Sequence, residues 1–71
     1  MYNNLEALIF INKISKYEMA EHLGITYNTL LAKISGKQPF KLDEAFEIQK
    51  QYFPNEEFNY IFKKTEKQKT A

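Results

Sequence analysis

Few side chains in this 71-residue chain could carry out acid–base or metal chemistry, and they do not converge. His22 is the only histidine, and the sequence contains no cysteine. The nine carboxylates are scattered instead of standing at the spacing of metal ligands or of a catalytic pair. Gly24 and Gly36 stand at expected helix ends, so they form no phosphate-binding loop. We therefore expect no enzymatic activity, no catalytic residue, no metal site and no cofactor.

The chemistry that remains is hydrogen bonding and charge. The net charge is only +1, but its distribution is uneven. Between residues 12 and 41, five lysines stand against two glutamates, a balance of +3. Residues 42–62 carry five acids and one lysine, a balance of −4, and residues 63–71 return to +3. Such a layout can create a basic face on a nearly neutral molecule, although a plain solvated helix surface would look the same.

Two short helices joined by a tight turn are predicted over residues 15–35, where they would position these groups. Ser15 and Glu18 match a capping box at the start of the first helix, which should end at Gly24. Thr26 is the expected cap of the second helix, with Leu30 facing inward together with Ile34. Two helices linked in this way make a helix-turn-helix, whose second helix can enter the major groove of DNA.

The same residues resemble the XRE/Cro family of helix-turn-helix regulators. The likeness lies in residues 19–26, 28–30 and 33–37, continues through 40–45 and closes with 58–62. It covers about residues 3 to 62. The resemblance implies a lambda-repressor-like fold and a sequence-specific transcriptional regulator, a Cro-type repressor that occupies a promoter. Small phage proteins are typical members of this family.

Base contacts are expected on the outer face of the second helix, opposite Leu30. Asn28 is the leading candidate, because an amide can pair in bidentate fashion with the N6 and N7 of adenine. Tyr27 could hydrogen-bond or stack, and Leu31 with Ala32 could contact thymine methyl groups. Leu31 could instead be partly buried against a helix or in a dimer contact. The chain has no arginine, so the expected site is A·T-leaning or read by shape, with low affinity as the alternative.

Contacts to the phosphate backbone are expected at the edges of this face. Lys16 lies in the first turn of the first of the two helices, where family members touch the backbone. Lysines anchor the register of a protein on DNA without reading bases. Plain solubility is the alternative for any single lysine. The predicted backbone contacts are Lys16, Thr29, Lys33, Lys37, Gln38 and Lys41.

The fold class expected from the whole chain is all-α, with five helices and one domain over residues 1–62. The remaining helices are predicted over residues 4–11, 42–52 and 55–62, with Asn3 and Asn55 as caps. An apolar stripe at helical spacing is expected to pack inward from the fourth helix. Its members are Leu42, Ala45, Phe46, Ile48, Gln49 and Tyr52. Residues 63–71 are expected to form a charged, disordered tail.

The expected partner is double-stranded operator DNA, bound by a homodimer at an inverted repeat. Neither a membrane nor a small-molecule ligand is expected, because the longest apolar run is only residues 7–11 and no signal peptide is apparent. The expected location is the cytoplasm of a bacterial cell or a phage-infected host. Phe10, Tyr52, Phe58 and Tyr60 could form the dimer interface or simply complete the core.

A second reading keeps the fold but changes the function. The chain could be a protein-binding module, such as an antitoxin or a phage-encoded inhibitor, because its charge is modest and its expected recognition helix is partly apolar. The lysines around that helix and the complete turn pattern oppose this reading.

Overall fold

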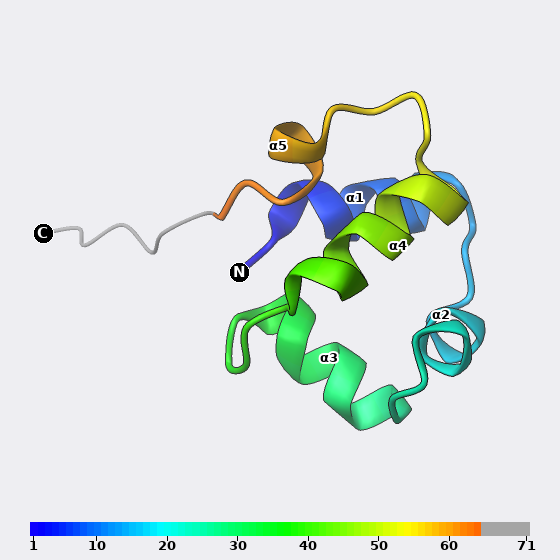
Figure 1. The fold of residues 1–71 in the computed structure, drawn as a ribbon, viewed down its shortest axis with the longest axis vertical. Coiled ribbons are helices and arrows are strands. Elements are labelled where there is room, and N and C mark those ends of the chain that lie inside the picture. Colours follow the sequence, from blue (N-terminus) through cyan, green and yellow to red (C-terminus); the bar gives the residue numbers. More distant parts are fainter. Residues whose placement is uncertain (65–71) are drawn as a thin grey trace, which may run out of the picture.

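The computed structural model describes residues 1–64, which form five helices and no strand. The helices are α1 (Asn3–Ile11), α2 (Lys16–Leu23), α3 (Tyr27–Ser35), α4 (Leu42–Tyr52) and α5 (Phe58–Ile61). In Figure 1, α4 crosses in front of α1, while α2 and α3 lie below them. The prediction of an all-α domain is confirmed. Within the described residues, no helix is long and apolar enough to cross a membrane.

The ends of α2 and α3 follow the local signals in the sequence. The Ser15 side-chain oxygen accepts a hydrogen bond from the Glu18 backbone N–H at 3.2 Å, and the Thr26 hydroxyl accepts one from Thr29 N–H at 3.1 Å. Gly24 and Gly36 end the two helices in the left-handed region, at φ 74° and 96°. Glycine adopts this conformation without the strain that a Cβ would cause.

Both outer helices begin differently from the prediction. Asn3 is already the first residue of α1, and no side chain caps that helix, so the prediction of Asn3 as its cap is wrong. The last helix begins at Phe58 instead of following an Asn55 cap. In the turn before this start, the Gln49 side chain donates a hydrogen bond to the Glu56 carbonyl at 3.0 Å. Residues 65–71 of the predicted tail lie outside the described residues.

The core forms where α1, α2, α3, α4 and α5 meet. It is built largely from the residues that the helical pattern turned inward, among them Leu5, Ile9, Met19, Leu30, Ile34, Ile48 and Ile61. The predicted inward stripe of α4 is wrong at two positions, because Leu42 is 65% exposed and Phe46 is 50% exposed. Ala45 and Ile48 alone provide its fully buried side. The side of α4 that carries Leu42 and Phe46 thus lies outside the core, although Ala45 between them is buried.

Candidate nucleic-acid interface

The α2–α3 pair is joined by a turn over residues 24–26 and presents the outer side of α3 to solvent. The Ile25 N–H donates to the Ala20 carbonyl at 3.0 Å, which fixes the turn directly behind Gly24. Leu30 and Ile34 anchor α3 in the core, where they are 0% and 3% exposed. Since α3 rotates by about 100° per residue, residues opposite these anchors must face outward.

Of the predicted base-contacting residues, Asn28 and Ala32 lie nearly opposite Leu30 on α3, whereas Tyr27 and Leu31 do not. Asn28 is exposed, and its amide makes no hydrogen bond to another group among residues 1–64. Tyr27, Leu31 and Ala32 are half-buried, so each presents only part of its side chain. The intermediate burial of Leu31 is compatible with either of its two predicted roles.

Tyr17 is a neighbour of this surface that the sequence reasoning missed. Its ring stacks on that of Tyr27 with centroids 3.9 Å apart and planes within 9°, while Tyr17 itself is 67% exposed. The stack holds the Tyr27 ring in one orientation at the start of α3. Both tyrosines stand in the first turn of a helix just after its cap, and this shared position is the signal that could have paired them.

The predicted backbone-contacting residues fall into two groups, and the first remains free. Lys37, Gln38 and Lys41 are exposed in the loop between α3 and α4. No ion pair engages either lysine within residues 1–64. They form a short basic edge beside the C-terminal end of α3.

The second group is already engaged within the protein. Lys16 pairs with Glu6 at 2.9 Å, with its side chain 26% exposed, so a phosphate would compete with that carboxylate. Thr29 is half-buried, and its hydroxyl oxygen accepts a hydrogen bond from the Thr26 hydroxyl at 2.8 Å. Its own hydrogen is still available for donation.

Lys33 is a correction to the predicted set of phosphate contacts. Its side chain is only 6% exposed, and the ammonium lies 3.0 Å from Glu44 and 3.1 Å from the Pro39 carbonyl. The Glu44 carboxylate also accepts from the Lys41 backbone N–H at 3.0 Å. A lysine buried in this way joins α3 to the loop and to α4, and it is not available to DNA.

His22 does not take part in a metal-binding arrangement. It is exposed and lies 3.9 Å from Glu47, with its ring edge-on to Tyr52. No group of three or more histidine or acidic side chains within residues 1–64 could hold a metal ion.

A separate apolar groove of about 870 Å³ lies between α1 and the start of α2. Its apolar lining includes Ile9, Phe10, Ile14, Tyr17 and Tyr27, and so it reaches the first residue of α3. The Lys16–Glu6 ion pair stands at its edge. The groove and the candidate interface therefore share the Tyr17–Tyr27 stack.

Comparison of the chain with protein-family models, curated proteins and solved structures gave no match.

Proposed function

We propose that this chain is a DNA-binding transcriptional regulator of the XRE/Cro type, which reads operator DNA with the outer face of α3. The observation that carries the proposal is the position of Asn28. It is an exposed amide in the first turn of a helix that Leu30 and Ile34 anchor in the core, beside the ordered ring of Tyr27. An amide held in this way can pair with adenine in the major groove.

The charge available for DNA is smaller than the count of lysines suggests. Lys33 is buried with Glu44 and Lys16 is paired with Glu6, which leaves Lys37 and Lys41 as unpaired lysines near α3 among the described residues. Each phosphate contact contributes about 0.9 to the slope of log affinity against log salt. Two such contacts give an expected slope of about −2 per copy, smaller in magnitude than for a strongly basic protein.

Repression would follow from occupation of a promoter by the bound protein. Helix-turn-helix dimers place their two recognition helices roughly 34 Å apart, so an inverted repeat with half-sites one helical turn apart is the expected operator. Neither a cofactor nor a small ligand enters this mechanism.

A selection of binding sites from a random duplex pool, at two salt concentrations, tests the proposal. The wild-type chain should enrich an A·T-leaning motif. Asn28→Ala should relax one position of that motif at a cost of about 1–3 kcal/mol, whereas Lys37→Ala should weaken all sequences alike and lower the salt slope by about one. Asn59→Ala, which alters an exposed asparagine on α5, is the matched control and should change neither result. Absence of any retention at low salt would remove DNA as the partner.

A protein partner is the second candidate, and the groove between α1 and α2 favours it. Its apolar lining is typical of surfaces that accept another side chain or helix. Substitution of the exposed lysines distinguishes the two candidate functions. DNA binding should depend on Lys37 and Lys41, whereas binding of a protein in the groove should not, because neither lysine lines it.

A further inference from the structure

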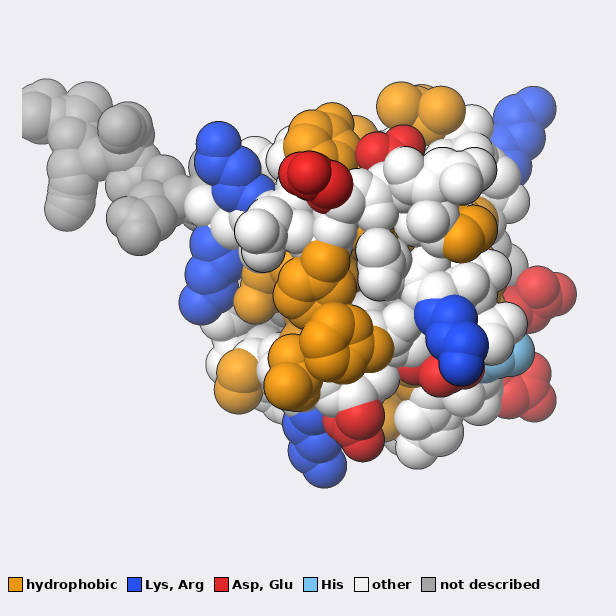
Figure 2. All heavy atoms as spheres, turned by 45° about the horizontal axis from the view of Figure 1, so that its top comes forward, with side chains coloured by type: hydrophobic (Ala, Val, Ile, Leu, Met, Phe, Trp, Pro, Cys, Tyr) orange, Lys and Arg blue, Asp and Glu red, His pale blue; other side chains and the backbone are white. Residues whose placement is uncertain are grey.

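The outer side of α4 carries an apolar patch formed by Leu42, Phe46 and Phe58, named the α4 patch here. Leu42 is 65% exposed and Phe46 is 50% exposed, and the Phe58 ring of α5 lies 4.8 Å from that of Phe46. Phe58 in turn contacts Phe62 at 5.0 Å, so the patch is the outer end of a continuous aromatic cluster. Figure 2 shows hydrophobic side chains gathered in one patch, with charged side chains at its edge.

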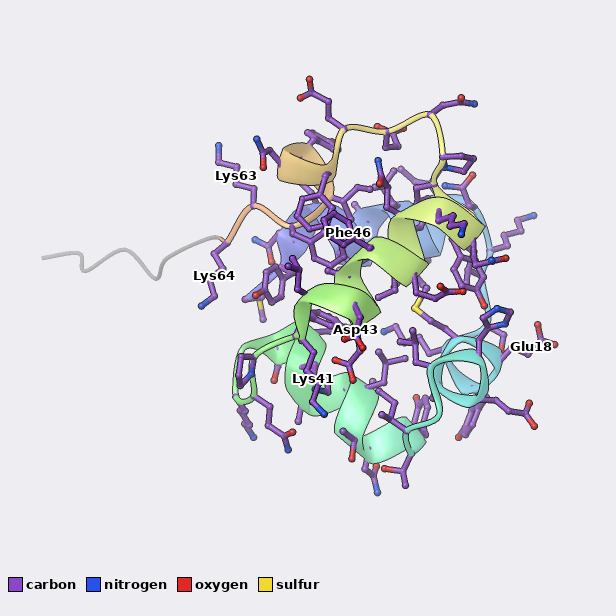
Figure 3. The ribbon with its side chains drawn as sticks, in the orientation of Figure 1. Glu18, Lys41, Asp43, Phe46, Lys63 and Lys64 are labelled. Atoms are coloured by element: carbon purple, nitrogen blue, oxygen red, sulfur yellow. The ribbon has the colours of Figure 1, made fainter. Side chains whose placement is uncertain are left out.

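Two charges of opposite sign flank Phe46 on the same side of α4. At about 100° per residue, Asp43 lies about 60° from Phe46 around the helix and Lys50 lies about 40° away in the same direction. Both are exposed, and neither forms an ion pair within residues 1–64. Figure 3 shows Asp43 in the first turn of α4, with Phe46 farther along the same helix.

The spacing of Asp43 and Lys50 along α4 allows each of them to face the opposite charge in a second copy. Asp43 stands three residues before Phe46, or about 4.5 Å along the axis, and Lys50 stands four residues after it, or about 6 Å. Suppose that two α4 helices pack antiparallel and cross at Phe46, related by a two-fold axis that is perpendicular to both helices and lies between them. The flank with Asp43 and Lys50 then lies on the same side of the contact in both copies. Each Asp43 then lies within about 1.5 Å of the level of Lys50 in the other copy. A parallel contact would instead carry this flank to the opposite side in the other copy, so neither Asp43–Lys50 pair could form.

We propose that a second copy of this chain covers the α4 patch, in an antiparallel two-fold contact centred on Phe46. Leu42 and Phe58 bury apolar surface around that centre, and two Asp43–Lys50 pairs close one side of it. Such a contact is isologous, since the same surface serves both copies. The patch is small beside a standard interface, so we expect a weak dimer with a dissociation constant on the order of micromolar.

The remaining charges on this flank do not oppose the arrangement. Glu47 is rotated by about 100° from Phe46, towards α2, and lies 3.9 Å from His22. The predicted DNA contacts lie outside the α4 patch. The contact does not depend on the proposed DNA binding, and it can be measured without DNA.

Sedimentation analysis over a range of protein concentrations provides the first test. The wild-type chain should change from monomer to dimer, and Phe46→Ser should remove the dimer. Ile11→Ser is the matched control, because Ile11 is 69% exposed on α1 and does not line the groove, so this change should leave association unchanged. Circular dichroism establishes that each variant is folded. A wild-type chain that stays monomeric at millimolar concentration overturns the proposal.

Charge exchange tests the antiparallel geometry without altering the apolar contacts. Asp43→Lys and Lys50→Asp should each weaken the dimer at least about tenfold, because each creates two repulsive pairs. An equimolar mixture of these two variants should form a 1:1 heterodimer, and the double variant should recover the homodimer. Equal association of every variant, or no gain in the mixture, would overturn the contact. Binding of DNA by a monomeric chain would reject this contact alone, whereas a dimer that binds no DNA would reject only the proposed function.

Discussion

The α2–α3 and α4–α5 regions of this domain are ordered by different kinds of interaction. In α2–α3, side-chain caps and terminal glycines lie within a few residues of the backbone groups that they serve. In α4–α5, the decisive contacts join separate segments, as in the Gln49–Glu56 hydrogen bond and the Phe46–Phe58 ring contact. Local chemistry therefore determines where α2 and α3 begin and end, whereas contacts between segments determine which faces of α4 and α5 are buried.

The largest expected effect comes from the ion pair that joins the two regions. Lys33→Met should lower the free energy of unfolding by about 3–5 kcal/mol, because the nearly buried Glu44 carboxylate would lose its cation. A 71-residue domain has only roughly 4–11 kcal/mol in total. Urea denaturation measures the loss. The double variant Lys33→Met/Glu44→Gln should recover much of it, and a double variant that is no more stable would mean that the pair itself is unimportant.

Ile48 and Leu42 are similar in size and lie on the same helix, but only Ile48 is buried. Ile48→Ala should cost about 2–4 kcal/mol, since Ile48 is fully buried, whereas Leu42→Ala should cost less than about 0.5 kcal/mol. Both residues belong to one apolar stripe in the sequence. Denaturation at low protein concentration, where the chain is monomeric, measures both. Similar losses for the two would show that the first turn of α4 is buried after all.

The two terminal glycines test how far local chemistry alone explains α2–α3. Gly24→Ala should cost about 1 kcal/mol from backbone strain alone, since its φ is positive and a Cβ there would meet nothing within 4 Å. Gly36→Ala should cost more, about 1–2 kcal/mol, since its Cβ would also lie 3.0 Å from the Met1 backbone nitrogen. Thermal unfolding of both variants measures the difference. Equal costs would mean that the Met1 contact yields freely.

The smallest effect should appear at alkaline pH. Burial, with a further contribution from Glu18, raises the pKa of Tyr52 above its usual value. The unfolded chain therefore ionises this phenol first, and the stabilising contribution present below about pH 10 is lost as the pH rises through the folded-state pKa. Tyr52→Phe should have a shallower loss of stability above pH 10, measured by urea denaturation at several pH values. If stability falls equally with pH in the wild type and in Tyr52→Phe, the Tyr52 phenol makes no such contribution.

The helical class and most of the helix boundaries could be predicted from the sequence. Ser15, Gly24, Thr26 and Gly36 act on backbone groups within a few residues, so their roles could be predicted without knowing the fold. The inward positions of α1 and α3 were also predictable, because Leu5 and Leu30 belong to apolar patterns that the small core can cover. The exposure of Asn28 followed from the same rotation about α3.

The side chains that remain available to a partner could be identified only from the packing of the helices. Lys33 looked like a surface lysine until Glu44 and the Pro39 carbonyl were brought to its ammonium, and Tyr17 gained its role only when α2 packed against α3. Phe46 looked like a core residue, but the packing of α4 leaves its side chain half exposed. The physical reason is that charge pairing, ring stacking and burial depend on distances between segments, which helical periodicity within one segment does not contain.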